Sequence, residues 1–144
     1  MIGGFLCGFL HTSLGCFVDV VGWKIIGIIN DPYMFISIGR GSGQLPGFLE
    51  QVYQNALYKE LCYRCMKVEC QKEILVHYKG ETVGRYIADM LVENRVILEL
   101  KAVQALRVEH EWQLINYLKA TGLEVGLLLN FGHSAEFKRK VFTK

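Results

Sequence analysis

The chain has 144 residues, of which 51% are hydrophobic and 21% are charged, and its formal net charge is +2. This composition excludes a disordered chain, and the length suits one domain with a sizeable core. So small a net charge does not by itself require a nucleic-acid partner. The C-terminal basic residues Lys138, Arg139, Lys140 and Lys144 indicate either a solvated tail or a small patch for phosphates.

Residues 1–46 are apolar and rich in glycine, with no Lys or Arg before Lys24. A signal peptide needs a positively charged start, and polar residues such as Asp19 interrupt the run that a membrane span would need. Pro32 and the glycines within 39–43 break regular structure. We therefore predict an irregular leader over 1–46 and a compact domain over 47–144, and we favour this reading over a membrane anchor.

From residue 47 onward the chain alternates between helical and strand patterns. Apolar residues recur at three- and four-residue spacing over 47–65, which predicts an amphipathic helix. The remaining elements are predicted as strands over 68–78, 84–93 and 96–103, a helix over 105–122 ended by Gly122, a buried strand over 124–132 and a last short helix or tail. A helix, a three-strand meander, a helix and a strand predict an α/β fold with a mixed sheet.

The five cysteines include a cluster at Cys62, Cys65 and Cys70. A structural zinc site needs four ligands, and no second C-x-x-C or H-x-x-x-H motif is present to complete one. We interpret these residues as buried, reduced thiols at a helix end, which predicts a reducing, cytoplasmic location.

Two of the predicted strands carry charged residues on one face. A three-residue loop would pair Val92 with Val96. The same register places Asp89 opposite Glu99, where the two like charges repel each other. Two facing carboxylates also suit Mg²⁺, which prefers oxygen ligands. Lys101 follows on the face of Glu99 and would orient or deprotonate a water, or neutralise developing charge. The alternatives are a two-residue loop, which would break the pairing, and an inert ion pair on an exposed edge strand.

The two predicted helices add polar groups. His110, Gln113 and Tyr117 are spaced to lie on one stripe of the later helix, which suits the wall of a cleft. The alternative is that Tyr117 belongs to the core and His110 to the surface. On the first helix, Glu50 and Tyr53 share one face.

These motifs together resemble the GxxExxY family of the PD-(D/E)XK nuclease superfamily. The resemblance spans roughly residues 47–140, and the Q-x-x-x-Y element also occurs in RecB-like nucleases. It rests on G-x-x-E-x-x-Y at Gly47, Glu50 and Tyr53, on Asp89, on the E-L-K motif of Glu99 and Lys101, and on Gln113 and Tyr117.

The resemblance implies a restriction-endonuclease-like core and a set of site residues. Asp89 and Glu99 would hold Mg²⁺ or Mn²⁺, Lys101 would serve the hydrolytic water, and Glu50 would complete the site from the first helix. The residues expected to contact the substrate are Gln113, Tyr117, His110 and Tyr53.

The chain departs from this family at its start. Family members usually run from a K-I-I-G-like segment almost directly into G-x-x-E-x-x-Y, whereas here residues 28–46 separate Gly27 from Gly47. We interpret 1–46 as inserted or over-extended. The predicted function is Mg²⁺-dependent hydrolysis of DNA or RNA. The alternatives are an inactive nuclease-fold module that binds a protein or a nucleic acid, and a metal-free structural protein.

Overall fold

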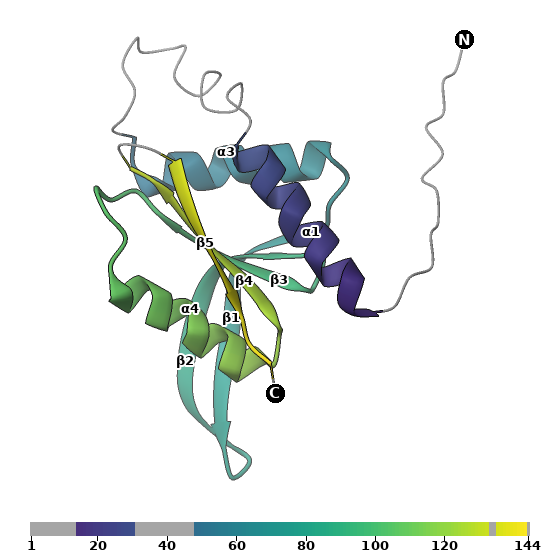
Figure 1. Cartoon of the computed structure of the whole chain (residues 1–144). Coiled ribbons are helices and arrows are strands. Elements are labelled where there is room, and N and C mark those ends of the chain that lie inside the picture. Colours follow the sequence, from purple (N-terminus) through teal and green to yellow (C-terminus); the bar gives the residue numbers. More distant parts are fainter. Residues whose placement is uncertain (1–13, 31–47, 133–134, 144) are drawn as a thin grey trace.

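The computed structural model describes residues 14–30, 48–132 and 135–143 (Figure 1). The helices are α1 (Leu14–Ile29), α3 (Glu50–Tyr63) and α4 (Val108–Thr121). The strands are β1 (Val68–Tyr78), β2 (Glu81–Val92), β3 (Val96–Lys101), β4 (Val125–Phe131) and β5 (Ala135–Val141).

The strands form one mixed sheet in the order β1-β2-β3-β4-β5. The first three strands are antiparallel neighbours, β4 runs parallel to β3, and β5 runs antiparallel to β4. α4 connects the two parallel strands, since a parallel pair needs a crossover. Helices α1 and α3 pack on one face of the sheet and α4 packs on the other (Figure 1). The predicted α/β fold with a mixed sheet is confirmed.

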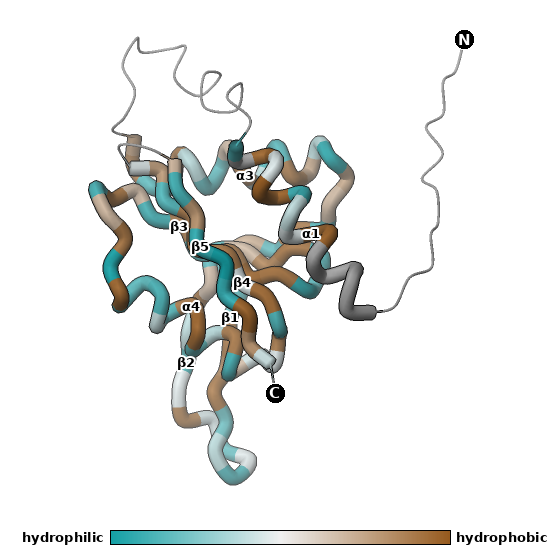
Figure 2. The backbone as a smooth tube through the Cα atoms, in the orientation of Figure 1, coloured by the Kyte–Doolittle hydropathy of each residue, from teal (hydrophilic) through white to brown (hydrophobic). Residues whose placement is uncertain are grey.

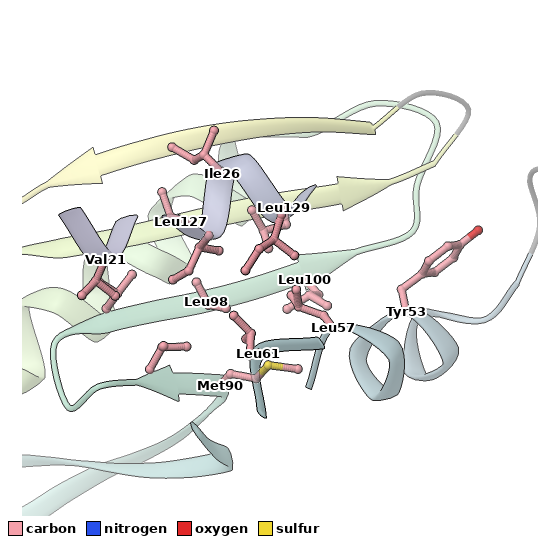
Figure 3. Packing of buried hydrophobic residues seen from close by; sticks show 14 of the residues in the cluster. Val21, Ile26, Tyr53, Leu57, Leu61, Met90, Leu98, Leu100, Leu127 and Leu129 are labelled. Carbon is pink, nitrogen blue, oxygen red and sulfur yellow. The ribbon is translucent and has the colours of Figure 1, made fainter. Parts of the chain in front are cut away.

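The central strands carry the core. β4 is buried throughout, and in β3 only Lys101 is partly exposed, so both strands bury apolar side chains on both faces. Figure 2 shows the hydrophobic colour gathered in the middle of the sheet. Figure 3 shows the larger cluster, in which α1 and α3 meet the sheet through Val21, Ile26, Leu57, Leu61, Met90, Leu98, Leu100, Leu127 and Leu129.

Helix α1 differs from the irregular leader that the sequence suggested. Val21, Ile25, Ile26 and Ile28 are buried in the cluster that α3 and the sheet share. A helix with an apolar stripe gains more by covering a sheet face than its glycines cost it. None of the helices in the described ranges is long and apolar enough to cross a membrane. Pro32 and the glycines of 39–43 lie outside the described residues, and a domain boundary after residue 46 stays a prediction.

The β2–β3 turn has the predicted length. Val92 pairs with Val96, and Glu93 and Asn94 adopt positive φ values of 53° and 54°. The Glu93 carboxylate accepts a hydrogen bond of 2.6 Å from the Lys67 backbone N–H. This contact ties the turn to the start of β1.

The C-terminal segment is a strand, so the predicted short helix or tail is wrong. β5 pairs with β4 from Phe131–Ala135 to Val125–Val141. Lys138 and Lys140 both form ion pairs with Glu111 of α4, and the Lys138 contact is 2.5 Å. Two of the basic residues are therefore committed to holding β5 against α4 and are not part of a solvated tail.

The Glu111 ion pairs predict a stabilisation that is present at neutral pH and lost in acid. Hydrogen bonds from Lys138 and Lys140 lower the pKa of Glu111 to about 2. A lowered folded-state pKa stabilises the fold above the ordinary value of 4.5, and this contribution is lost as the pH falls towards 2. We expect Glu111→Gln to melt below wild type at pH 7, with the gap closing between pH 5 and pH 2. Thermal unfolding across this range measures it. Glu109→Gln, an exposed change on the same helix, is the control; a gap that does not vary with pH would contradict the prediction.

Candidate active site

Asp89 lies where the β2–β3 ladder stops. The last pair is Met90–Leu98, and the Asp89 carboxylate then accepts the Leu100 backbone N–H at 2.7 Å. The Asp89 backbone carbonyl accepts a hydrogen bond of 3.2 Å from the side chain of Gln54 on α3. The strand pairing follows the predicted register up to Met90–Leu98. At Asp89, side-chain hydrogen bonds replace it.

Glu99 is a buried carboxylate in the central strand. It is 2% exposed, and one carboxylate oxygen contacts Lys101 Nζ at 2.7 Å. The other oxygen, Oε2, is buried and has no hydrogen-bond partner. Burial, followed by the negative charge of Asp89, raises the pKa of Glu99 to about 7 despite the bond from Lys101. An exposed edge-strand ion pair is thus excluded for Glu99 and Lys101.

Burial acts in opposite directions on the pKa values of Asp89 and Lys101, yet both pKa values are raised overall. Burial raises the pKa of Asp89, although hydrogen bonds from Leu100 and Gln71 and the charge of Lys101 oppose the shift. Burial alone would lower the pKa of Lys101, but the hydrogen bond to Glu99 and the nearby carboxylates raise it overall. Lys101 is therefore an ammonium at neutral pH.

Glu50 reaches this cluster from the first turn of α3. Burial raises its pKa, with Lys101 opposing and Asp89 reinforcing the shift, and its carboxylate accepts a hydrogen bond from the backbone of Ala102. His110 lies close enough to oppose the raised pKa of Glu50 as well. The start of α3 and the start of α4 therefore lie at the same end of β3.

Tyr117, in the polar stripe of α4, lies near the Glu99 and Asp89 carboxylates. Gln113 Nε2 donates to Tyr117 Oη at 2.6 Å, and this hydroxyl donates to the Ile87 carbonyl at 3.1 Å. Burial raises the pKa of Tyr117, and the charges of Glu99 and Asp89 add to the shift. Because Tyr117 is only 2% exposed, it supports Gln113 from below and leaves the Gln113 side chain nearer the surface.

His110 lines a pocket of about 570 Å³ with Val103, Gln104, Ala105 and Arg107. The Arg107 backbone N–H donates to His110 Nδ1 at 3.2 Å. A nitrogen that accepts this bond carries no proton, so neutral His110 bears its proton on Nε2. His110 therefore offers one ring N–H as a donor.

A family model described as the PD-(D/E)XK nuclease superfamily matches residues 34–141. The chain belongs to this superfamily. The crystal structure of SSO0001 is similar, with 16% sequence identity and a TM-score of 0.56; the match covers 84% of this chain and 63% of that one. An alkaline exonuclease (LHK-Exo) from Laribacter hongkongensis is 14% identical over 77% of this chain and 68% of its own, with a TM-score of 0.49. At these identities the likeness to SSO0001 shows the fold alone. No curated protein matches the chain significantly.

Tyr53 of this PD-(D/E)XK chain is 2% exposed. Its ring stacks on Phe131 with centroids 5.0 Å apart, and Phe48 meets it edge-on at 6.2 Å. Packing of α3 on β4 accounts for a tyrosine here, and the geometry does not support the expected contact with a substrate.

Several residues that support the site were not predicted from the sequence. Buried Asn130 donates to the Val103 carbonyl at 2.8 Å and accepts from the Val103 N–H at 3.0 Å, which clamps the loop after β3. A Cβ on Gly132 would lie 1.8 Å from the same carbonyl, so only glycine fits. A polar residue inside an otherwise apolar strand was the available signal for Asn130. Nothing in the sequence marked Gln54.

The donor atoms fit a divalent cation, which nucleases of this superfamily typically use. Glu99 Oε2 is buried without a partner, and the Asp89 carboxylate is its acidic neighbour. Mg²⁺ is commonly held by one or two carboxylates, with waters and phosphate completing its shell. Among the described residues no three His, Cys, Asp or Glu side chains converge as a metal cage. Asp89 and Glu99 therefore suit the ion as a pair, and Glu50 as a third ligand stays a prediction.

The raised pKa of Glu99 predicts a loss of stability towards alkaline pH. Its folded-state pKa of about 7 exceeds the ordinary 4.5, so the folded protein holds this proton more tightly than the unfolded chain. The contribution is fully present below pH 4.5 and is lost as the pH rises through 7, at most roughly 3 kcal/mol. Urea unfolding at pH 5, 6.5 and 8 without divalent ions should show this decline.

Glu99→Gln removes the titrating group and should flatten that profile. Glu81→Gln, an exposed change near the tip of the β1–β2 hairpin, should retain it. An equal decline in Glu99→Gln and wild type would show that another group is responsible.

Proposed function

We propose that this chain is a divalent-metal-dependent nuclease of the GxxExxY family that hydrolyses phosphodiester bonds in DNA or RNA. The observation that carries the proposal is the buried Glu99, with one carboxylate oxygen bound to Lys101 and the other without a partner beside Asp89. Leaving a carboxylate oxygen unsatisfied in a sheet is costly, and a cation would relieve that cost. The motif residues Gly47, Glu50 and Tyr53 support the family assignment.

Each residue is proposed to act within hydrolysis of one P–O bond. Asp89 and Glu99 would hold Mg²⁺ or Mn²⁺, with Glu50 adding a third carboxylate. When bound, such an ion polarises a phosphoryl oxygen and makes a bound water more acidic. Lys101, which stays protonated, would orient the attacking water and stabilise charge that develops on phosphate oxygens. A new bond forms between water oxygen and phosphorus, and the alcohol leaves with a proton.

The substrate-contacting residues are proposed around the mouth of this site. Gln113 and the His110 Nε2–H would donate hydrogen bonds to phosphate or sugar oxygens of a strand lying along α4. Tyr117 holds Gln113 in place through its 2.6 Å contact. Cys62, Cys65 and Cys70 are free thiols that are exposed and not buried as expected, and their reduced state suits the cytoplasm as the location of the protein.

An inactive nuclease-fold module that binds a protein or nucleic acid is the second candidate. It is favoured by one observation: no three-ligand metal cage is formed among the described residues. The two candidates differ in what the site does with a metal and a nucleic acid together. An active enzyme degrades the substrate, whereas a module binds it intact.

Removal of Lys101 tests the active enzyme. We expect wild type to cleave labelled single- or double-stranded DNA or RNA with Mg²⁺ or Mn²⁺ and to stop when EDTA is added. Lys101→Met should lower the cleavage rate by roughly 100-fold or more, because a preorganised charge at the reacting phosphate is lost. Lys119→Ala, at the far end of α4 from His110, is the control and should cleave normally. Binding without cleavage of any of these substrates would favour the inactive module.

Removal of Asp89 tests the metal pair without an assay of cleavage. An ion that binds only the folded protein raises its melting temperature by mass action. We expect millimolar Mg²⁺ to stabilise wild type at pH 7. Asp89→Asn should gain little from the ion yet melt at least as high as wild type without it, because the charge beside Glu99 is gone. An equal gain in both proteins would place the ion elsewhere.

A further inference from the structure

Gln71 has an unusual backbone for its place in the fold. Its φ is +51°, in the left-handed region that side chains other than glycine rarely adopt. Of the other non-glycine residues with positive φ among those described, all lie in the turns between elements: Cys65, Lys79, Glu93 and Asn94. Gln71 alone lies inside a strand, and such isolated strain is often kept at functional sites.

The register of β1 and β2 places this strain beside Asp89. Cys70 pairs with Met90 and Lys72 pairs with Ala88, so Gln71 stands opposite Asp89. Within this ladder the positions before and after are paired, yet none of its pairs joins Gln71 to Asp89. Facing residues of an antiparallel pair have Cβ atoms about 5 Å apart, close enough for a glutamine to reach a carboxylate.

The ladder on the other side of Asp89 also stops. Leu100 gives its N–H to the Asp89 carboxylate, and Gln54 donates to the Asp89 backbone carbonyl. Asp89 is thus released from ordinary strand pairing on both sides and is held by three groups from β1, β3 and α3. Of these three groups only Gln71 stands on a strained backbone, and its side chain is near enough to the Asp89 carboxylate to lower the pKa of that group.

We propose that Gln71 is a positioning residue that holds the Asp89 carboxylate beside Glu99, and that its left-handed backbone is kept for this purpose. The inference rests on the proposed role of Asp89 as a metal ligand. Hydrogen bonds to a metal-binding carboxylate orient it, and their loss commonly weakens metal affinity by 10- to 100-fold. Gln71 itself touches neither the ion nor the substrate in this proposal.

Gln71→Gly separates the strain from the contact, because glycine adopts positive φ freely but has no carboxamide. Without divalent ions, we expect this variant to melt about 3 °C above wild type. Its affinity for Mg²⁺, measured by calorimetric titration at pH 7, should fall roughly tenfold or more. A residue that only supports the fold would not raise stability and lower metal affinity together. Gln71→Asn keeps a carboxamide and tolerates the left-handed region, so it should recover part of the affinity.

Lys79→Gly is the matched control, since Lys79 is exposed and has a φ of +48° in the β1–β2 turn. It should gain stability in the same way and bind Mg²⁺ as wild type does. If wild type binds Mg²⁺ and Gln71→Gly binds it equally well, the positioning role is overturned while the proposed function stands. If wild type itself does not bind Mg²⁺ or Mn²⁺, both are overturned.

Discussion

The burial of Glu99 in the central strand is the constraint on which the site depends. An ionised carboxylate in a sheet interior is costly unless it is paired, and only one of its two oxygens is paired here, with Lys101. The flanking residues Leu98 and Leu100 are fully buried on the opposite face and hold β3 between β2 and β4. Glu99 therefore cannot turn to solvent without breaking the core. The packing of the whole sheet therefore keeps Glu99 Oε2 buried without a hydrogen-bond partner.

Helices α3 and α4 carry the remaining polar groups of the site, because both helices begin near the end of β3. The loop after β3 leads directly into α4, so His110 in its first turn stays near Lys101. α3 lies on the other face, and Glu50 at its first position reaches the backbone of Ala102. Asn130 then clamps Val103 and stops this loop from moving away from the sheet. A site at one end of a central strand is thus walled by both helical layers and by β4.

The part of this arrangement that could be predicted was set by short-range geometry. The three-residue turn fixed the pairing of Val92 with Val96, and period-two alternation then put Glu99 and Lys101 on one face. The parts that could not be predicted depend on tertiary contacts. The glycines of α1 predicted an irregular segment, but the helix is stabilised by the apolar stripe that it packs against the sheet.

β5 and Tyr53 are two further cases in which tertiary contacts could not be predicted from the local sequence. The charged run of β5 looked like a solvated tail because Glu111, its partner, is distant in sequence. Tyr53 looked like part of a polar site because it shares a face with Glu50, yet its ring packs on Phe131. In both cases a local pattern was compatible with two environments, and only the packing of a remote strand decided between them.

The two interruptions of the sheet at Asp89 follow from what a regular ladder would do there. Continuous pairing would give the Leu100 N–H to a backbone carbonyl and leave the Asp89 carboxylate free to turn away from Glu99, the direction that charge repulsion favours. In the structure that N–H donates to the Asp89 carboxylate, and Gln54 of α3 donates to the backbone carbonyl of Asp89 itself. Side-chain hydrogen bonds therefore hold both the carboxylate and the backbone of Asp89 where the ladder stops. The net cost is the repulsion between two carboxylates held together, which a divalent ion would turn into attraction.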